Sequence, residues 1–185
     1  LDDKLELSDK AATVAAGDYN QWLELLTHYF PEEGSGQVNG IIWNTGDAPD
    51  HSILEGPDTY TQRHCEGILE FLKAIRTRRI EWLDRGFQIV TGNAAAFLPD
   101  DNVRAESAQF WGFGRVVINE NPPLRGRVID NQSTEDNTES LVEIFLTETR
   151  ESQLGLRGDT IYFPRLIPSK APVVEEGLPV TEDAT

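Results

Sequence analysis

The chain contains no methionine, a single cysteine and few basic side chains. Methionine is missing even from position 1, so we expect the chain to be a piece of a longer polypeptide. Cys65 has no partner for an internal disulfide, which favours a reducing, cytoplasmic compartment. Because Cys65 lies among helix-forming residues, we interpret it as a packing residue rather than a nucleophile.

Positive charge is scarce, with 16 Lys and Arg against 32 Asp and Glu, for a formal net charge of −16. Such a charge repels nucleic acids and anionic membranes, so neither is an expected partner. No apolar run approaches the roughly 18 residues of a membrane span, and no basic-then-apolar leader opens the chain. We interpret the cluster Arg76, Arg78 and Arg79 as cations at a helix C-terminus, not as a DNA-binding patch.

Hydrophobic periodicity predicts helices that alternate with strands. Residues 3–15 predict two short strands, and Asp18 is the expected N-cap of a helix over 18–30. Further helices are predicted over 59–83, from 105 and over 134–149. Buried strands are predicted at 40–46 and 87–94, a further strand at 126–132, and two short strands at 153–168 with a turn at 157–159.

This order predicts an α/β fold: a truncated Rossmann-like, mostly parallel sheet with right-handed crossovers, flanked by helices on both faces, and a C-terminal β-hairpin. Residues 169–185 follow Pro168, hold two prolines and show no helical period, so we interpret them as a linker. The predicted organisation is one Rossmann-like domain over residues 1–168 followed by this linker.

The motifs of a nucleotide enzyme are missing. The segment after the strand at 40–46 has no Gly-rich spacing and carries acids. Gly112 and Gly114 have the spacing of the first two glycines of a dinucleotide turn, but Val117 takes the third position and the pair lies within a helical pattern. We therefore expect both glycines to permit close packing of a helix. No tyrosine has a lysine four residues later, and there is no P-loop or nucleophile elbow.

The titratable side chains predict no catalytic or metal centre. His28, His51 and His64 lack metal-ligand spacing, and we expect His28 and His64 on helix surfaces. The acidic pairs, Asp100-Asp101 and Glu175-Glu176, are interpreted as solvated loop charges. We therefore assign no catalytic, cofactor-binding or metal-binding residue.

The stretch AQFWGFGRVVINENPPLRGRVID resembles the structural subdomain of a modular polyketide synthase ketoreductase. The family pattern is a helix of the form QAPLWGLGRVIALEHPEL followed by a strand that ends in Asp. It is matched at Gln109, Trp111, Gly112, Gly114, Arg115, Val116, Pro122, Leu124 and Asp130. FQIVTGNA is similar to the family's LWLVTRGA strand. LGLRGDTIYFPRL resembles its ALRGGRRYVARL hairpin, matched at Leu156, Arg157, Gly158, Tyr162, Arg165 and Leu166. The resemblance covers roughly residues 18–168.

The resemblance implies a non-catalytic, N-terminal half that stabilises a second, catalytic half. In the family, the catalytic half binds NADPH and reduces a β-ketoacyl group on an acyl carrier protein. No cofactor is then expected on this chain, which is no enzyme on its own. The expected partners are the catalytic half and neighbouring synthase domains, with the acyl carrier protein as an indirect partner. Trp111, Gly112, Gly114 and Arg115 are the candidate interface with the catalytic half.

Departures from the family pattern leave three further interpretations open. Asn44-Thr45 and Asn119-Glu120-Asn121 differ from the common form. They are compatible with the pseudo-ketoreductase scaffold of a methyltransferase-containing module. The second interpretation is an independent nucleotide-binding enzyme with an atypical loop at 46–56, and the third is a free-standing acidic interaction module.

Overall fold

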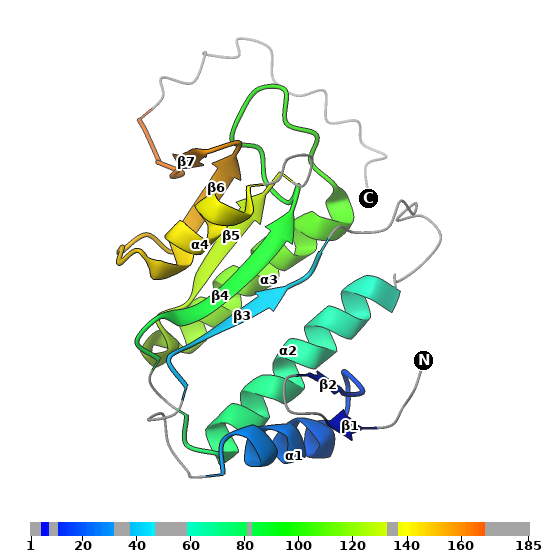
Figure 1. Ribbon diagram of the computed structural model, residues 1–185. Coiled ribbons are helices and arrows are strands. Elements are labelled where there is room, and N and C mark those ends of the chain that lie inside the picture. Colours follow the sequence, from blue (N-terminus) through cyan, green and yellow to red (C-terminus); the bar gives the residue numbers. More distant parts are fainter. Residues whose placement is uncertain are drawn as a thin grey trace, which may run out of the picture.

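The computed structural model describes residues 5–7, 11–31, 38–46, 59–80, 83–132 and 137–168. These residues form an α/β fold in which helices flank a mostly parallel sheet (Figure 1), as predicted. The helices are α1 (Tyr19–Tyr29), α2 (Thr59–Thr77), α3 (Ala105–Glu120) and α4 (Thr138–Leu146), with a 3-10 turn η3 (Pro122–Leu124). The strands are β1 (Glu6–Leu7), β2 (Ala12–Thr13), β3 (Gly40–Asn44), β4 (Gly86–Gly92), β5 (Arg127–Asn131), β6 (Gln153–Arg157) and β7 (Thr160–Tyr162).

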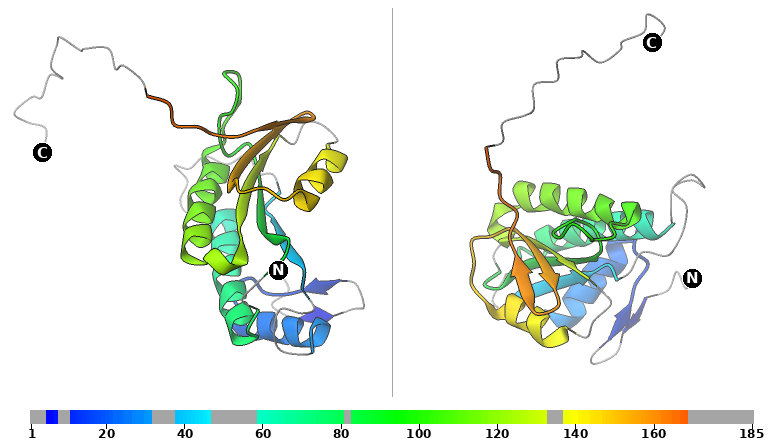
Figure 2. Two further views of the ribbon diagram at one scale, coloured as in Figure 1. Left: turned by 90° about the vertical axis from the view of Figure 1, so that its left-hand side faces the viewer. Right: turned by 90° about the horizontal axis from the view of Figure 1, so that it is seen from above.

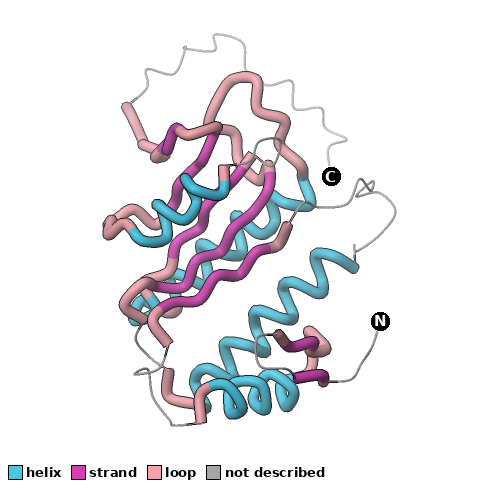
Figure 3. Tube along the Cα trace, viewed as in Figure 1, coloured by secondary structure: helices cyan, strands magenta, loops and turns pink. Residues whose placement is uncertain are grey.

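The main sheet has the strand order β3-β4-β5-β6-β7. The first four strands are parallel, and β7 returns antiparallel to β6 (Figure 3), which confirms the predicted C-terminal hairpin. β1 and β2 pair antiparallel in a separate small sheet, as residues 3–15 predict. From β4 onward, each strand of the main sheet therefore lies beside the strand that precedes it in the chain.

Helices cover both faces of the sheet, but unequally (Figure 2). On one face, α1, α2 and α3 enclose a core that includes Phe87 and Ile89 of β4. On the other face, α4 is the one helix among the described residues that packs on the sheet, through Ile144 on Ile129, Leu154 and Leu156. All these core side chains are at most 3% exposed. The predicted layers are confirmed.

The three crossovers do not share one hand, so the prediction of right-handed crossovers is wrong for one of them. The chain moves in one direction across the sheet from β3 to β6, yet α2 and α3 lie on one face and α4 on the other. The β5-α4-β6 connection is thus opposite in hand to the other two. The α3 side of β6 is already occupied, because Phe97 and the Arg157 guanidinium lie there. The apolar side chains of β6, Leu154 and Leu156, point to the other face, and α4 covers them.

Two predictions for single elements are wrong: the burial of the first strand of the main sheet and the end of the second long helix. The strand at 40–46 was expected to be buried, but β3 is an edge strand with only one side covered, and Ile42 is 53% exposed. The helix expected to reach 83 ends at Thr77, because Arg79 takes a left-handed conformation (φ 55°) and the Ile80 N–H bonds back to the Ile75 carbonyl. This is a Schellman-type ending, and it buries Ile80 beyond the helix rather than on its face.

The first helix begins where predicted. The Asp18 carboxylate accepts hydrogen bonds from the N–H groups of Asn20 and Gln21, which caps α1. Trp22 then extends from α1 toward the sheet, with its ring centroid 5.7 Å from that of Trp43 and 5.2 Å from that of Phe71. These aromatic contacts join α1 to β3 and α2.

Gly112 and Gly114 both lie inside α3, as predicted, but only Gly114 serves close packing. A methyl group at position 114 would lie 2.8 Å from Val128 Cγ2 and 3.3 Å from Ile89 Cδ1. The absence of a side chain therefore lets α3 seat directly on β4 and β5. At position 112 a methyl group would meet nothing within 4 Å, so the predicted packing role is wrong for Gly112, which lies on the outer face of α3.

Alanine substitutions at these two glycines should change stability in opposite directions. Gly112→Ala should raise the free energy of unfolding by about 0.5–1 kcal/mol, because alanine favours an exposed helix interior. Gly114→Ala should lower it by about 1–3 kcal/mol, because the added methyl overpacks the helix–sheet contact. Urea denaturation of the two variants measures both values, and equal effects would contradict the assigned packing.

Several sequence predictions fall partly or wholly outside the described residues. Wholly outside are His51, the linker at 169–185 and the Glu175-Glu176 pair, and partly outside are the strands within 3–15, the atypical loop at 46–56, the end of the helix at 59–83 and the start of the helix at 134–149. Among the helices that the structure describes, none is long and apolar enough to cross a membrane.

Candidate functional site at the carboxyl edge of the sheet

The topology places a potential crevice at the carboxyl ends of β4 and β5. The chain leaves β4 toward α3 on one face and leaves β5 toward α4 on the other. In open α/β sheets, ligands bind where adjacent strands send their connections to opposite faces, because the two loops separate there. This edge is the first place to look for a nucleotide site.

The crevice contains a buried carboxylate, Asp130, near the end of β5. Its side chain is 0% exposed. Its Oδ1 accepts hydrogen bonds from Thr91 Oγ1 at 2.9 Å and from the Ala94 N–H at 2.6 Å. Its Oδ2 accepts from the Ala95 N–H at 3.4 Å and from Arg157 Nη2 at 2.8 Å. Asp130 therefore ties the loop after β4 to the ends of β5 and β6.

Arg157 at the end of β6 joins Asp130 to a second acid, Asp101. Its Nη2 lies 2.8 Å from Asp130 Oδ2 and 2.9 Å from Asp101 Oδ2. Its Nε donates to Asp101 at 3.0 Å, and its other donors reach backbone carbonyls, including those of Asp130 and Ala95. The side chains of Arg157 and Asp101 are 4% and 6% exposed. We call Asp101, Asp130 and Arg157 the carboxyl-edge triad.

Two opposing effects set the pKa values of the triad: burial disfavours the charged form of each side chain, and the ion pairs and hydrogen bonds favour it. Burial raises the pKa of Asp130 above its usual value despite its hydrogen bonds and the charge of Arg157. Burial also acts to raise the pKa of Asp101, but the hydrogen bonds from Arg157 and from the N–H groups of Phe97 and Leu98 bring it below its usual value. Burial acts to lower the pKa of Arg157, and the two acids raise it instead.

An aromatic side chain closes the crevice beside the triad. The Phe97 ring lies against Gly155 of β6 so closely that a methyl group at position 155 would come within 2.5–2.6 Å of three ring carbons. The Arg157 guanidinium carbon lies 5.2 Å from the centroid of the same ring, within the range of a cation–π contact. Phe97 and Arg157 therefore cover the α3-facing side of β6, next to the carboxyl ends of β4 and β5.

The interpretation of Asp100-Asp101 as solvated loop charges is wrong for Asp101. Asp100 is exposed, but Asp101 is buried because its Oδ2 accepts two loop N–H groups, from Phe97 at 2.7 Å and Leu98 at 3.0 Å, and pairs with Arg157. The sequence offered a signal for Asp130, which lies near the end of a predicted parallel strand, but it placed Arg157 in the turn of the C-terminal hairpin; the structure shows that β6 pairs parallel with β5. Carboxyl ends of parallel strands share one edge of a sheet, so these opposite charges were placed to meet.

His64 is not on a helix surface, contrary to prediction, whereas His28 is exposed as expected. His64 is half-buried, and its Nδ1 accepts a hydrogen bond from Trp43 Nε1 at 3.2 Å. Its ring also meets Tyr60 and Phe110 edge-on. Burial, and secondarily the charge of Arg63, lowers the pKa of His64.

Stability should consequently depend on His64 in mildly acidic solution. Because its folded pKa lies below the unfolded value of about 6.5, the unfolded chain binds the proton more readily. The contribution of His64 to the free energy of unfolding is therefore complete above the unfolded pKa of about 6.5. It is lost as the pH falls below that value toward the folded pKa. Unfolding free energies at pH 7.5 and 5.5 (values chosen to bracket about 6.5) should differ less in His64→Gln than in the parent chain. An unchanged difference would contradict this assignment.

The four predicted interface residues share α3 but differ in exposure. Gly112 and Arg115 are exposed, Trp111 is half-buried and Gly114 is buried against the sheet. The Trp111 ring lies edge-on to Phe97, with centroids 5.8 Å apart. Trp111 thus connects the outer side of α3 to the loop that closes the crevice.

The described residues contain no group of three His, Cys, Asp or Glu side chains arranged to hold a metal ion. Cys65 is partly buried, and burial raises the pKa of its thiol, with a further contribution from Glu66. A raised thiol pKa disfavours the nucleophilic thiolate, which agrees with a packing role.

Comparison with known proteins identifies the family. Residues 8–166 match the family model described as "Polyketide synthase extender module SpnB, Rossmann fold domain". This match spans most of the chain. The chain belongs to this family.

Solved ketoreductases share the fold of this extender-module Rossmann domain. A C2-type ketoreductase from a modular polyketide synthase is similar at 23% identity and a TM-score of 0.61, over 82% of this chain and 32% of that chain. The first ketoreductase of the tylosin synthase gives 19% identity and a TM-score of 0.59, over 82% of this chain and 30% of that one. A keto acid-selecting NRPS module with adenylation, ketoreductase and pseudo Asub parts is similar at 18% identity and a TM-score of 0.66, over 89% of this chain and 14% of that chain. The chain thus spans about a third or less of these structures.

Proposed function

We propose that this Rossmann-fold domain is the non-catalytic structural half of a polyketide synthase ketoreductase. Its role would be to stabilise the catalytic half, which would bind NADPH and reduce a β-ketoacyl group on an acyl carrier protein. The observation that carries the proposal is the filled crevice: Asp130, Arg157 and Asp101 satisfy one another where a cofactor would otherwise bind. A saturated ion network leaves few donors for a pyrophosphate, and its two carboxylates would repel one.

Cofactor binding tests this proposal directly. Titration of NADPH into the chain, followed by calorimetry and by nicotinamide fluorescence, should give no saturable signal. The cation at the crevice is Arg157, and its guanidinium is already committed to two carboxylates. Saturable binding would overturn the proposal and favour an independent nucleotide-binding enzyme, whose atypical loop at 46–56 would then be the site to map.

The outer face of α3 is the proposed contact with the catalytic half. It presents Gly112, Arg115 and Val116 to solvent, and Val116 is 50% exposed. An exposed β-branched residue next to a bare glycine offers a flat, partly apolar surface of the kind that protein interfaces bury.

A pair of variants can test the contact without disturbing the core. Val116→Asp should weaken association with a separately expressed catalytic half at least about tenfold, because it places a charge in a desolvated contact. Val142→Asp is the matched control, since Val142 on α4 is 46% exposed on the opposite side of the sheet. Trp111→Ala should also weaken association. Equal affinities for the parent chain and Val116→Asp would count against this face.

A further inference from the structure

The last strand, β7, lies at one edge of the main sheet, and no strand among the described residues pairs with its outer side (Figure 1). The hairpin that contains β7 lies wholly within the described range 137–168. Proteins usually protect an edge strand by keeping it short or by charged side chains, prolines or bulges. Residues 160–163 carry no charge and no proline. Apart from its length of three residues, β7 therefore lacks the usual protection against an added strand.

The hairpin turns the backbone of Ile161 toward this open edge. Ile161 lies opposite Leu156 in the antiparallel pair of β6 and β7. The Leu156 carbonyl accepts a hydrogen bond from the Gln132 N–H at 3.3 Å, so it points toward β5 and away from β7. Opposite residues of an antiparallel pair either bond to each other or both point outward. Ile161 therefore directs its N–H and C=O away from β6, and Phe163 does the same because the chain runs on without a turn or bend.

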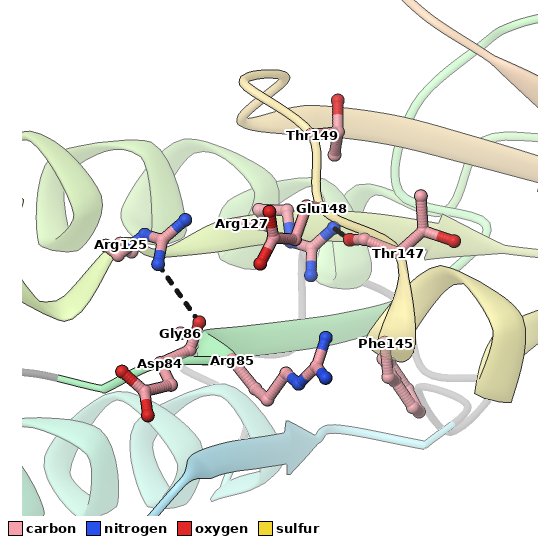
Figure 4. A pocket seen from close by; sticks show the side chains of 9 residues that line it. All are labelled: Asp84, Arg85, Gly86, Arg125, Arg127, Phe145, Thr147, Glu148 and Thr149. Carbon is pink, nitrogen blue, oxygen red and sulfur yellow. Dashed lines mark hydrogen bonds between the residues drawn. The ribbon is translucent and has the colours of Figure 1, made fainter.

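The described part of the chain leaves these outward backbone groups without a partner. At the amino edge of the sheet, by contrast, Arg127 Nη1 donates to the Thr147 carbonyl at 3.1 Å (Figure 4). Among the residues that the structure describes, no comparable donor or acceptor reaches the outward backbone of Ile161 or Phe163. A row of open N–H and C=O groups is a template for another strand. The matching ligand is thus an extended polypeptide segment.

Exposed apolar side chains accompany the open backbone. Ile161 and Phe163 are 36% and 41% exposed. Ile161 lies opposite Leu156, whose side chain packs under α4. Ile161 and Phe163 therefore extend the apolar row of β6 beyond the part that α4 covers. A strand with apolar side chains at alternate positions would cover both residues from the side.

Continuity with the outer face of α3 indicates which polypeptide supplies the strand. The Tyr162 ring, on the other face of β7, lies 6.5 Å from the Phe97 ring between centroids, and Phe97 lies 5.8 Å from Trp111 of α3. A row of aromatic rings thus joins β7 to the contact proposed for the catalytic half. Pairing with a second copy of this chain is disfavoured, because it would bring together two formal charges of −16.

We propose that β7 accepts a β-strand from the catalytic half, so that the main sheet continues across the boundary between the two halves. The incoming strand would bond to the outward N–H and C=O groups of Ile161 and Phe163 and cover their side chains. This inference rests on the proposed function, because it takes the catalytic half as the partner. It adds strand pairing through the backbone to the side-chain contact on α3.

Amide hydrogen exchange, followed by NMR of the isotope-labelled chain, tests the added strand. In the free chain, the Ile161 and Phe163 N–H groups should exchange without protection, whereas the Tyr162 N–H, which faces Gly155 of β6, should be protected. Saturation with the separately expressed catalytic half should slow exchange at Ile161 and Phe163 at least about tenfold. Slow exchange at these two amides in the free chain alone would overturn the proposal, because the edge would then already be covered.

A proline variant tests the same bonds through affinity. Ile161→Pro removes an N–H that points away from β6, and proline is tolerated on the open side of an edge strand. It should unfold in the same urea range as Ile161→Val, but it should bind the catalytic half at least about tenfold more weakly. Ile161→Val is the matched control, since it keeps the N–H and a β-branched side chain, and it should bind within about threefold of the parent chain. Equal affinities of the proline and valine variants would overturn the added strand.

The outcomes separate this inference from the proposed function. Association without slower exchange at Ile161 and Phe163 would overturn the added strand and leave the structural-half assignment standing. No association at all would overturn both. A dimer of this chain alone in sedimentation velocity, with the same two amides protected, would overturn the catalytic half as the source in favour of a second copy.

Discussion

Replacing Arg157 with methionine should lower the free energy of unfolding by about 3–5 kcal/mol, which is the usual effect of breaking a buried ion pair from one side. Asp130 is fully buried and Asp101 is nearly so, and Arg157 is the cation that both carboxylates contact. The variant leaves two acids in a space closed by Phe97, from which water cannot easily solvate them. Urea denaturation, followed by tryptophan fluorescence and by circular dichroism, measures the loss.

The same end of the chain supplies a matched control. Arg165 pairs with Glu151 at 2.7 Å, but these side chains are 58% and 35% exposed. Arg165→Met should therefore cost only about 0–1 kcal/mol, as solvent screens an exposed pair. Similar losses for the two methionine variants would show that the carboxyl-edge triad has no special role.

A compensating substitution keeps this prediction testable if Arg157→Met fails to fold. Asp130→Asn combined with Arg157→Met removes the buried charge of Asp130 together with its partner. This double variant should be more stable than Arg157→Met alone, because the asparagine can still accept from Thr91 Oγ1 and the Ala94 N–H. A double variant that is no more stable would refute the electrostatic explanation.

Gly86→Ala should destabilise the chain by about 2–5 kcal/mol, from two costs that add. Gly86 has φ 75°, and a non-glycine residue in the left-handed region costs about 1–2 kcal/mol. Its added methyl would also overlap the backbone carbonyl of Arg125, which the adjoining strand holds in place, and overpacking of this kind costs about 1–3 kcal/mol. Thermal and urea unfolding of the variant measure the sum.

Gly46 separates the two costs. It has a similar φ of 65°, but a methyl group there would meet none of the described residues within 4 Å. Gly46→Ala should therefore cost only the backbone term, about 1–2 kcal/mol. If both alanine variants lose the same stability, the close approach of Arg125 to Gly86 is unimportant.

The sequence was sufficient for the order of helices and strands, because α3, β4 and the Asp18 cap carry strong local signals. Predictions from the sequence were wrong for the exposure of β3 and for the end of α2, because both depend on packing and local backbone conformation that the residue pattern does not contain. An apolar run such as the one in β3 looks the same whether one or both of its sides are covered. The end of α2 was missed because Arg79 takes the conformation in which glycine is usual.

The candidate site was harder to predict than the fold. The segments that carry Asp101, Asp130 and Arg157 are about 30 residues apart in sequence, and only the parallel register brings them together. The predicted close packing was correct for Gly114 and wrong for Gly112, because the sequence does not show which face of α3 meets the sheet. Helical rotation turns one toward Val128 and the other toward solvent, and a spacing pattern does not say which.

The strand order has a consequence for how the protein is made. Because β3, β4, β5, β6 and β7 pair strictly with their neighbours in the chain, the sheet can grow strand by strand as synthesis proceeds from the N-terminus. Arg157 is then the last member of its triad to emerge from the ribosome. Until it arrives, Asp130 and Asp101 must stay hydrated, which keeps the carboxyl edge open. Docking of β6 would then neutralise both acids, and the pairing of β7 would complete the sheet.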